Sequence, residues 1–239
     1  MSILRPGGIE LTRYALSAGQ VKPGGALLDI GCGDGTAADL ARREFHLDVT
    51  GIDVDENAVA QAKEKGVAAQ VMDAAALEFP SRSFDVVMME CVFSVLERQE
   101  ESIHEAYCVL RPGGVLLMSD LCCRHPDLAR WRQEYREAMA LLRRPREEGE
   151  CEREEHVPSP YCQDGAVVPE GLRLLLDELE MEVILYEDRT EDLKTFAGQA
   201  ILDYNCAEVR LEAGGGWAPC RCSGKNIGYF LLIARKKDA

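Results

Sequence analysis

The chain has 239 residues, a length that predicts one α/β domain with a decorated end or an inserted cap. Hydrophobic residues make up 46% of the chain and charged residues 29%, a composition that excludes disordered, collagen-like and membrane-spanning proteins. The 27 Lys and Arg residues against 42 Asp and Glu residues give a formal net charge of −15, so neither nucleic acid nor an anionic membrane surface is an expected partner.

No apolar run reaches the roughly 18 residues that a membrane-spanning helix requires. The first ten residues include one basic residue and no apolar stretch of signal-peptide length, so we expect a cytoplasmic protein. Its ten cysteines would then stand in a reducing compartment. There they are expected to act as buried packing residues, metal or metalloid ligands, or reactive thiols rather than as a disulfide framework.

Helices and strands alternate through the first half of the chain. The apolar spacing first predicts a helix at 9–20, within an N-terminal segment of residues 1–24. Short apolar runs separated by helical periodicity follow, a pattern typical of a parallel sheet covered by helices on both faces. The predicted strands span 26–30, 48–53, 67–72, 83–90 and 115–119, and the predicted helices between them span 36–44, 57–65 and 99–110.

The pattern changes after residue 120. Residues 121–168 are rich in charge, contain several prolines and include a predicted helix at 130–142, so we interpret them as an inserted substrate cap. Regular order returns in 169–239, the C-terminal part of the sheet. We expect one domain, 1–239, with its core in 25–120. The C-terminal part has predicted helices at 171–179 and 192–204 and predicted strands at 181–186 and 227–234.

A glycine-rich loop follows the first predicted strand. Gly31, Gly33 and Gly35 lie between that strand and a helix. Glycine permits positive φ and close approach of a ligand to the backbone, and the helix N-terminus offers free N–H groups. The G-x-G-x-G spacing differs from the G-x-G-x-x-G of dinucleotide-binding folds. The loop therefore predicts a small ligand that carries a carboxylate or phosphate.

Acidic residues end the next three predicted strands. Asp53, Asp73 and Glu90 come at the carboxyl ends of the second, third and fourth strands. In an open α/β sheet this edge is the ligand crevice. Asp53 lies twenty residues beyond Gly33, where a carboxylate can accept hydrogen bonds from both hydroxyls of a ribose. The combination predicts a nucleoside-containing ligand across the carboxyl edge of the sheet.

Five motifs follow one another in the predicted core: LLDIGCGDGT (27–36), VTGIDVDENAV (49–59), QVMDAAALEFP (70–80), SFDVVMMECVFSVL (83–96) and VLRPGGVLLMSD (109–120). In this order and spacing they resemble class I S-adenosylmethionine-dependent methyltransferases. Within them the chain is most similar to the small-molecule branch, with its type 11 methyltransferase domain and its quinone-biosynthesis enzymes. The resemblance implies an α/β, Rossmann-like, doubly wound sheet of seven strands in the order 3-2-1-4-5-7-6, with the last strand antiparallel.

The resemblance also implies S-adenosylmethionine as the cofactor and assigns its contacts. Asp29 would lie under the amino group of the methionine part, and Asp53 would bind the ribose hydroxyls. Glu90 would face the methionine part and the substrate. The other implied contacts are Gly31 and Gly33 at the methionine part, Val54, Asp73 and Ala74 at the adenine, and Tyr14 at the carboxylate. Cys32, between the two glycines of the loop, is also counted among the cofactor-binding residues.

The catalytic groups are less defined than the cofactor contacts. A thiolate, enolate or neutral amine acceptor needs no general base, whereas a carbon or oxygen acceptor benefits from one. His125 and His156 lie in or beside the predicted cap and are the candidates for that base. We expect transfer of a methyl group to a small-molecule acceptor, which the cap would select.

Seven cysteines lie outside the core, so an arsenite or thiol methyltransferase is an alternative. Soft thiolates bind zinc, copper(I) or trivalent arsenic, although no C-x-x-C pair for zinc is present. The candidate thiols are Cys122, Cys123, Cys220 and Cys222.

Two further alternatives do not depend on the cysteines as methyl acceptors or arsenite ligands of an enzyme. A cofactor-binding sensor or a metal-binding partner protein is the non-enzymatic alternative. A nicotinamide dehydrogenase is disfavoured by the glycine spacing.

Overall fold

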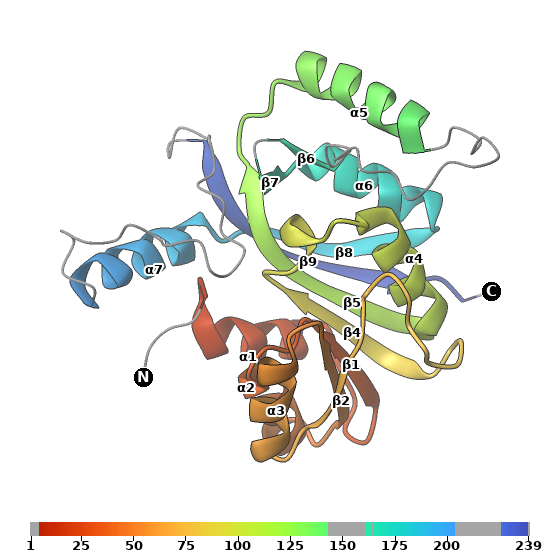
Figure 1. Cartoon of the computed structure of the whole chain (residues 1–239), viewed down its shortest axis with the longest axis vertical. Coiled ribbons are helices and arrows are strands. Elements are labelled where there is room, and N and C mark those ends of the chain that lie inside the picture. The colour runs from red at the N-terminus through yellow and green to blue at the C-terminus, as the bar shows by residue number, and fades with distance from the viewer. Residues whose placement is uncertain (1–4, 143–160, 164, 204–225, 239) are drawn as a thin grey trace.

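The computed structural model describes residues 5–142, 161–163, 165–203 and 226–238 (Figure 1). Among these residues, no helix has both the length and the apolar character needed to cross a membrane. Helices flank a central twisted sheet on both faces, and the strands of the N-terminal half make up one side of it (Figure 1). The chain therefore has the layered arrangement that the alternating pattern predicts.

The long strands form one mixed sheet in the order β3-β2-β1-β4-β5-β9-β8. β1 to β5 are parallel, whereas β9 is antiparallel to both β5 and β8. The predicted order is confirmed, because β8 and β9 are the predicted sixth and seventh strands. The strands are β1 (Ala26–Ile30), β2 (Asp48–Asp53), β3 (Ala68–Val71), β4 (Phe84–Glu90), β5 (Leu110–Cys123), β8 (Met181–Asp188) and β9 (Ile227–Lys236).

β5 is much longer than the predicted strand at 115–119. It runs on past the end of β4, with Leu121 to Cys123 still paired to β9. Beyond the end of β4, this edge of β5 pairs instead with a short hairpin of β6 (Cys162–Gln163) and β7 (Ala166–Val167), in which Val167 pairs with Cys122. The first residues of the predicted cap range thus belong to the sheet, and the hairpin brings the other end of that range beside the end of β4.

Alternate residues of each buried strand face the two helical layers, as the period of two requires. Leu27 belongs to the core cluster that includes residues of α1 to α3, whereas Leu28 belongs to the cluster that includes residues of α4 and α6. The helices are α1 (Gly8–Ala18), α2 (Thr36–Glu44), α3 (Glu56–Glu64), α4 (Gln99–Val109), α5 (Leu128–Leu142), α6 (Pro169–Glu178) and α7 (Thr190–Asp203), with a 3₁₀ turn η1 (Phe93–Val95) after β4.

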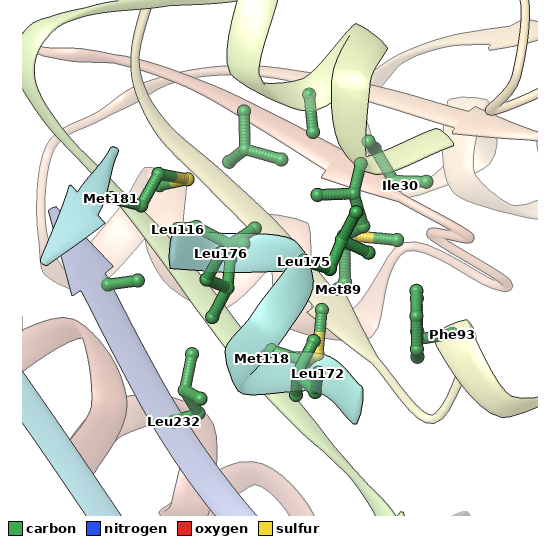
Figure 2. Packing of buried hydrophobic residues seen from close by; sticks show 14 of the residues in the cluster. Ile30, Met89, Phe93, Leu116, Met118, Leu172, Leu175, Leu176, Met181 and Leu232 are labelled. Atoms are coloured by element: carbon green, nitrogen blue, oxygen red, sulfur yellow. The ribbon is translucent and has the colours of Figure 1, made fainter. Parts of the chain in front are cut away.

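Leucines of α6 cover the sheet near the centre of the larger core cluster (Figure 2). Leu172, Leu175 and Leu176 are almost fully buried and lie against Met118 of β5 and its neighbours. Their i, i+3, i+4 spacing places them on one face of the helix. This packing holds the part of the chain that follows the predicted cap against the central strands of the sheet.

Aromatic side chains attach α5 to the same layer. The Trp131 ring lies 5.5 Å from Tyr135, which lies 6.0 Å from Tyr161. A Cβ atom added at Gly171 would come within 2.9 Å of the Trp131 ring, so the absence of a side chain there lets α5 approach α6. In Figure 1, α5 lies on the outer side of α6, away from the sheet.

Lys236 stabilises the end of α4, and its replacement gives a testable prediction. Its ammonium group is buried and donates to the carbonyl oxygens of Tyr107 (2.6 Å) and Leu110 (2.9 Å). We expect Lys236→Met to lower the free energy of unfolding by about 1.5–3 kcal/mol, because two carbonyls at a helix C-terminus lose a charged donor. Urea unfolding measures this, with Lys237→Met as the exposed neighbouring control; equal effects of the two changes would contradict the assignment.

Candidate functional site

The glycine loop joins β1 to α2 and wraps around the end of β2. The N–H groups of Gly31 and Cys32 both donate to the Ile52 carbonyl, at 2.8 and 2.9 Å. Gly31, Gly33 and Gly35 have φ values of +71°, +51° and +77°, in the left-handed region that favours glycine. The first residues of the loop are therefore anchored to the neighbouring strand.

The three glycines of the loop differ in what surrounds them. A Cβ atom added at Gly31 would lie 2.5 Å from Val92 Cγ2, and one at Gly35 would lie 2.8 Å from Ala62 Cβ. At Gly33 it would meet nothing within 4 Å. Gly31 and Gly35 thus serve the close packing of the loop, whereas Gly33 borders open space that a ligand can fill.

Asp53 joins the end of β2 to this loop. Its Oδ2 atom accepts a hydrogen bond from the Gly33 N–H at 2.9 Å, and its Oδ1 atom accepts one from the Asp55 N–H at 3.0 Å. Each carboxylate oxygen can accept a second hydrogen bond. Because its side chain is only partly buried, Asp53 can bind the two hydroxyls of a diol without losing these backbone contacts.

Asp29 lies beneath the loop, one residue before the end of β1. It is 3% exposed, and its Oδ2 atom accepts no hydrogen bond from any residue in the described part of the chain. Burial raises the pKa of Asp29 well above its ordinary value of 3.8, and the nearby charges of Glu90 and Asp53 raise it further. A buried acceptor without a donor fits the ammonium group of an amino acid.

This raised pKa predicts a pH dependence of stability. Since the folded protein holds the Asp29 proton more tightly than the unfolded chain, its stability falls as pH rises from 3.8 towards the folded pKa. We expect Asp29→Asn to remove this part of the decline, by about 1.4 kcal/mol for each unit of pKa difference. Thermal unfolding from pH 4 to 8 measures it; parallel curves for the two proteins would contradict the prediction.

Glu90 ends β4 and is held by the N-terminal segment. Its carboxylate accepts from Arg5 Nη2 at 2.5 Å and from Thr12 Oγ1 at 3.0 Å, and Arg5 Nη2 also donates to Thr12. The side chains of Arg5 and Glu90 are 15% and 9% exposed. Arg5 and Thr12 give no signal in the sequence beyond a threonine on the buried face of a helix, so sequence reasoning missed both.

The turn after Glu90 is fixed by buried polar contacts. Cys91 has a φ of +56°, and its Sγ atom lies 2.9 Å from the Tyr229 hydroxyl, which is 3.1 Å from Ser119 Oγ. Asp120 accepts from both N and Oγ of Ser94, at 2.9 and 2.7 Å. These contacts from β5 and β9 hold η1 next to the glycine loop.

A partly apolar surface lies at the ends of β2 and β3. Val54 is 72% exposed and Val71 is 51% exposed, on neighbouring strands. Asp73 is exposed, accepts from the Ala75 N–H at 2.9 Å and lies 3.7 Å from Arg98, and Ala74 is buried beside it. Exposed valines next to a carboxylate suit a flat heteroaromatic ring that carries an amino group.

Tyr14 and Cys32 make contacts other than those implied by the family resemblance. The Tyr14 hydroxyl donates to Glu187 on β8 at 2.6 Å, and its ring lies under Arg189. Cys32 is buried in the loop, and its sulfur would lie 2.8 Å from a Cβ atom added at Gly51. Burial raises the pKa of the Cys32 thiol to about 12, so this residue packs the loop rather than supplying a thiolate.

The candidate catalytic and metal residues do not gather in the described structure. His125 is exposed, and its backbone N–H donates to Asn226 Oδ1 at 2.8 Å. Cys122 and Cys123 are buried, and burial raises the pKa of Cys122 to about 11. Over the described ranges, no group of three His, Cys, Asp or Glu could hold a metal ion. His156, Cys220 and Cys222 lie outside the described residues.

Comparison with known proteins identifies the family of the segment that forms this edge of the sheet. Residues 28–118, which begin within β1 and end within β5, match the family described as a methyltransferase domain. This segment is a class I S-adenosylmethionine-dependent methyltransferase domain. S-adenosylmethionine is the cofactor of such domains. Three observations fit it: the open space at Gly33, the buried acceptor of Asp29 and the free acceptor capacity of Asp53.

Two curated relatives show what this methyltransferase domain is similar to. It is 30% identical over 122 residues to phosphoethanolamine N-methyltransferase 3 of Arabidopsis thaliana, covering 48% of this chain and 25% of that protein. It is 35% identical over 103 residues to 2-methyl-6-phytyl-1,4-hydroquinone methyltransferase of Synechocystis, covering 41% of this chain and 32% of that protein. The match thus spans a quarter to a third of these relatives.

The fold is similar over almost the whole chain to that of the solved [4+2]-cyclase SpnF. The two share 24% sequence identity and a TM-score of 0.69, and the similarity covers 97% of this chain and 82% of SpnF. At this level of identity the comparison shows the fold alone. The similarity of fold therefore extends beyond residues 28–118 to the C-terminal strands.

Proposed function

We propose that this protein transfers a methyl group from S-adenosylmethionine to a small-molecule acceptor. The observation that carries the proposal is the hydrogen bond from the Gly33 N–H to the Asp53 carboxylate. It joins a carboxylate that can bind a diol to a loop position that borders open space. Both residues lie inside the segment that matches the methyltransferase family. The net charge of −15 also suits a cationic donor.

The methionine and ribose parts would be held by residues at the ends of β1, β2 and β4. Asp29 would accept from the amino group, with its free Oδ2 atom as the acceptor. Gly31 and Gly33 would line the chain of the methionine, and Asp53 would accept from the ribose hydroxyls. Glu90 would lie towards the reacting end, because it ends the strand beside β1.

The adenine would lie over the ends of β2 and β3. Val54 would contact one face of the ring, Asp73 would accept from its amino group, and Ala74 would supply a backbone N–H. The exposure of Val54 in the protein alone supports this role, because a ligand ring would cover apolar surface that water now contacts. Cys32 would support the loop from below, and Tyr14 would reach the cofactor only after leaving Glu187.

When bound, the cofactor supplies an electrophilic methyl group on a sulfonium. The residues of this chain would contribute by position and by charge rather than by covalent chemistry. The glycine loop and Asp53 would orient the donor, and the carboxylates at the strand ends would favour its positive charge. Residues of α5 and the β6–β7 hairpin would cover the acceptor side and exclude water.

The acceptor would be selected by residues of the predicted cap, 121–168. The names of the two curated relatives suggest phosphoethanolamine and a prenylated hydroquinone as the first acceptors to test. A hydroquinone would require loss of a proton, for which His125 and His156 are the proposed bases. Arsenite is the acceptor that would fit the cysteine-rich remainder of the chain.

The test is transfer of labelled methyl from S-adenosylmethionine to each of these three acceptors, with S-adenosylhomocysteine formation as the second readout. We expect acceptor-dependent formation of S-adenosylhomocysteine with one of the small molecules. Transfer to arsenite alone would replace this proposal with the metalloid alternative. Tight binding of S-adenosylmethionine without turnover on any small-molecule acceptor would contradict transfer and favour a cofactor-binding sensor.

A further inference from the structure

The Arg5–Glu90 ion pair lies next to the glycine loop. Met89 pairs with Ile30 across β4 and β1, so the next residues, Glu90 and Gly31, are neighbours at the same edge of the sheet. Adjacent strands are about 4.8 Å apart. A ligand on the glycine loop would therefore lie within about one Debye length of the Arg5 guanidinium.

Arg5 brings a positive charge to a group of carboxylates. Asp29, Asp53 and Glu90 lie at or next to the ends of the neighbouring strands β1, β2 and β4. Each is negatively charged when its carboxyl group is ionised. Arg5 Nη2 contacts Glu90 directly, and Thr12 of α1 holds both side chains. With Arg5 in place the Arg5–Glu90 pair is neutral, and without it Glu90 would present an unbalanced negative charge to the ligand space.

We propose that Arg5 sets how strongly the site prefers the methyl donor over the demethylated product. The inference rests on the proposed function. S-adenosylmethionine and S-adenosylhomocysteine differ by one methyl group and one positive charge on sulfur, and they share the ribose, adenine, amino and carboxylate groups. A fixed cation near the reacting end opposes the sulfonium but not the neutral thioether. Arg5 therefore weakens donor binding relative to product binding.

A different role for Arg5 would be to bind the carboxylate that donor and product share. Its Nη2 atom is already bonded to Glu90 and Thr12, and its Nε atom is buried without a hydrogen-bond partner among the described residues. Loss of a carboxylate contact would weaken both ligands equally. The two roles are therefore separated by the ratio of the two dissociation constants rather than by either constant alone.

The experiment is calorimetric titration of the full chain with S-adenosylmethionine and with S-adenosylhomocysteine. In Arg5→Gln we expect the preference for the donor to rise by about three- to thirtyfold, the range of a screened charge interaction at this separation. Arg5→Lys keeps the charge and should keep the wild-type ratio. Arg13→Gln removes an exposed cation from the same segment of the chain and should leave the ratio unchanged.

The outcomes separate this inference from the proposed function. If the wild-type chain binds neither ligand, the proposed function fails. If it binds both but Arg5→Gln leaves their ratio unchanged, or weakens both equally, the role of Arg5 is overturned while the function stands. Should Arg5→Gln fail to fold, a changed ratio in Arg5→Lys would equally overturn the inference, because charge alone is held to set the preference.

Discussion

Replacing Asp53 with alanine should weaken the binding of S-adenosylmethionine by roughly 10- to 150-fold, or about 1.5–3 kcal/mol. The carboxylate is expected to accept from both ribose hydroxyls, and these charge-assisted hydrogen bonds are lost together. The same side chain holds the Gly33 N–H, so its removal also frees the part of the loop that borders the ligand space. Calorimetric titration of the purified variant measures the loss.

Asp48→Ala is the matched control for this change. Asp48 is an exposed aspartate at the opposite end of the same strand, where it pairs with Ala26. The Asp48→Ala variant should bind S-adenosylmethionine with the same affinity as the wild-type chain. Unchanged affinity in Asp53→Ala, with a folded protein, would show that the ribose site lies elsewhere.

Replacing Gly35 with alanine should lower the free energy of unfolding by about 2–4 kcal/mol. Gly35 has a φ of +77°, and an added Cβ would lie 2.8 Å from Ala62 Cβ and 2.9 Å from Ala62 Cα. Because Ala62 lies within α3 and one of these atoms belongs to its backbone, the clash cannot be relieved by a side-chain rotation. Urea unfolding with a two-state analysis measures the loss.

Gly24→Ala separates conformational strain from the steric clash. Gly24 has a φ of +79°, and an added Cβ would meet nothing within 4 Å. The Gly24→Ala change should therefore lower the free energy of unfolding only by the strain of the left-handed backbone, about 1 kcal/mol. If Gly24→Ala and Gly35→Ala destabilise the chain equally, the close packing of α3 against the loop is not what requires glycine at position 35.

Local sequence patterns predicted the N-terminal half of the chain well, because its strands are short apolar runs that end at or next to a glycine or an acidic residue. β1 was predicted to the residue, and the ends of β2 and β4 were predicted correctly at Asp53 and Glu90. The strand order came from the family resemblance rather than from periodicity. Because the carboxyl ends of parallel strands lie at one edge of the sheet, the order of these residues along the chain was enough to predict that they lie close together.

Contacts between distant segments could not be predicted. The pairing of Arg5 with Glu90 joins residues 85 positions apart, and the contact of Cys91 with Tyr229 joins residues 138 positions apart. The extension of β5 past β4 depends on pairing with β9, which no local pattern encodes. Tyr14 was assigned by resemblance, and its position beside Glu187 follows from where β8 returns to the sheet.

Calorimetric titration of the reduced protein tests most directly whether the carboxyl edge of β1, β2 and β4 binds S-adenosylmethionine. We predict binding of S-adenosylmethionine with a micromolar dissociation constant and no binding of NAD at the same concentrations. Binding of NAD in place of S-adenosylmethionine, or of neither ligand by a folded protein, would contradict the account of this site.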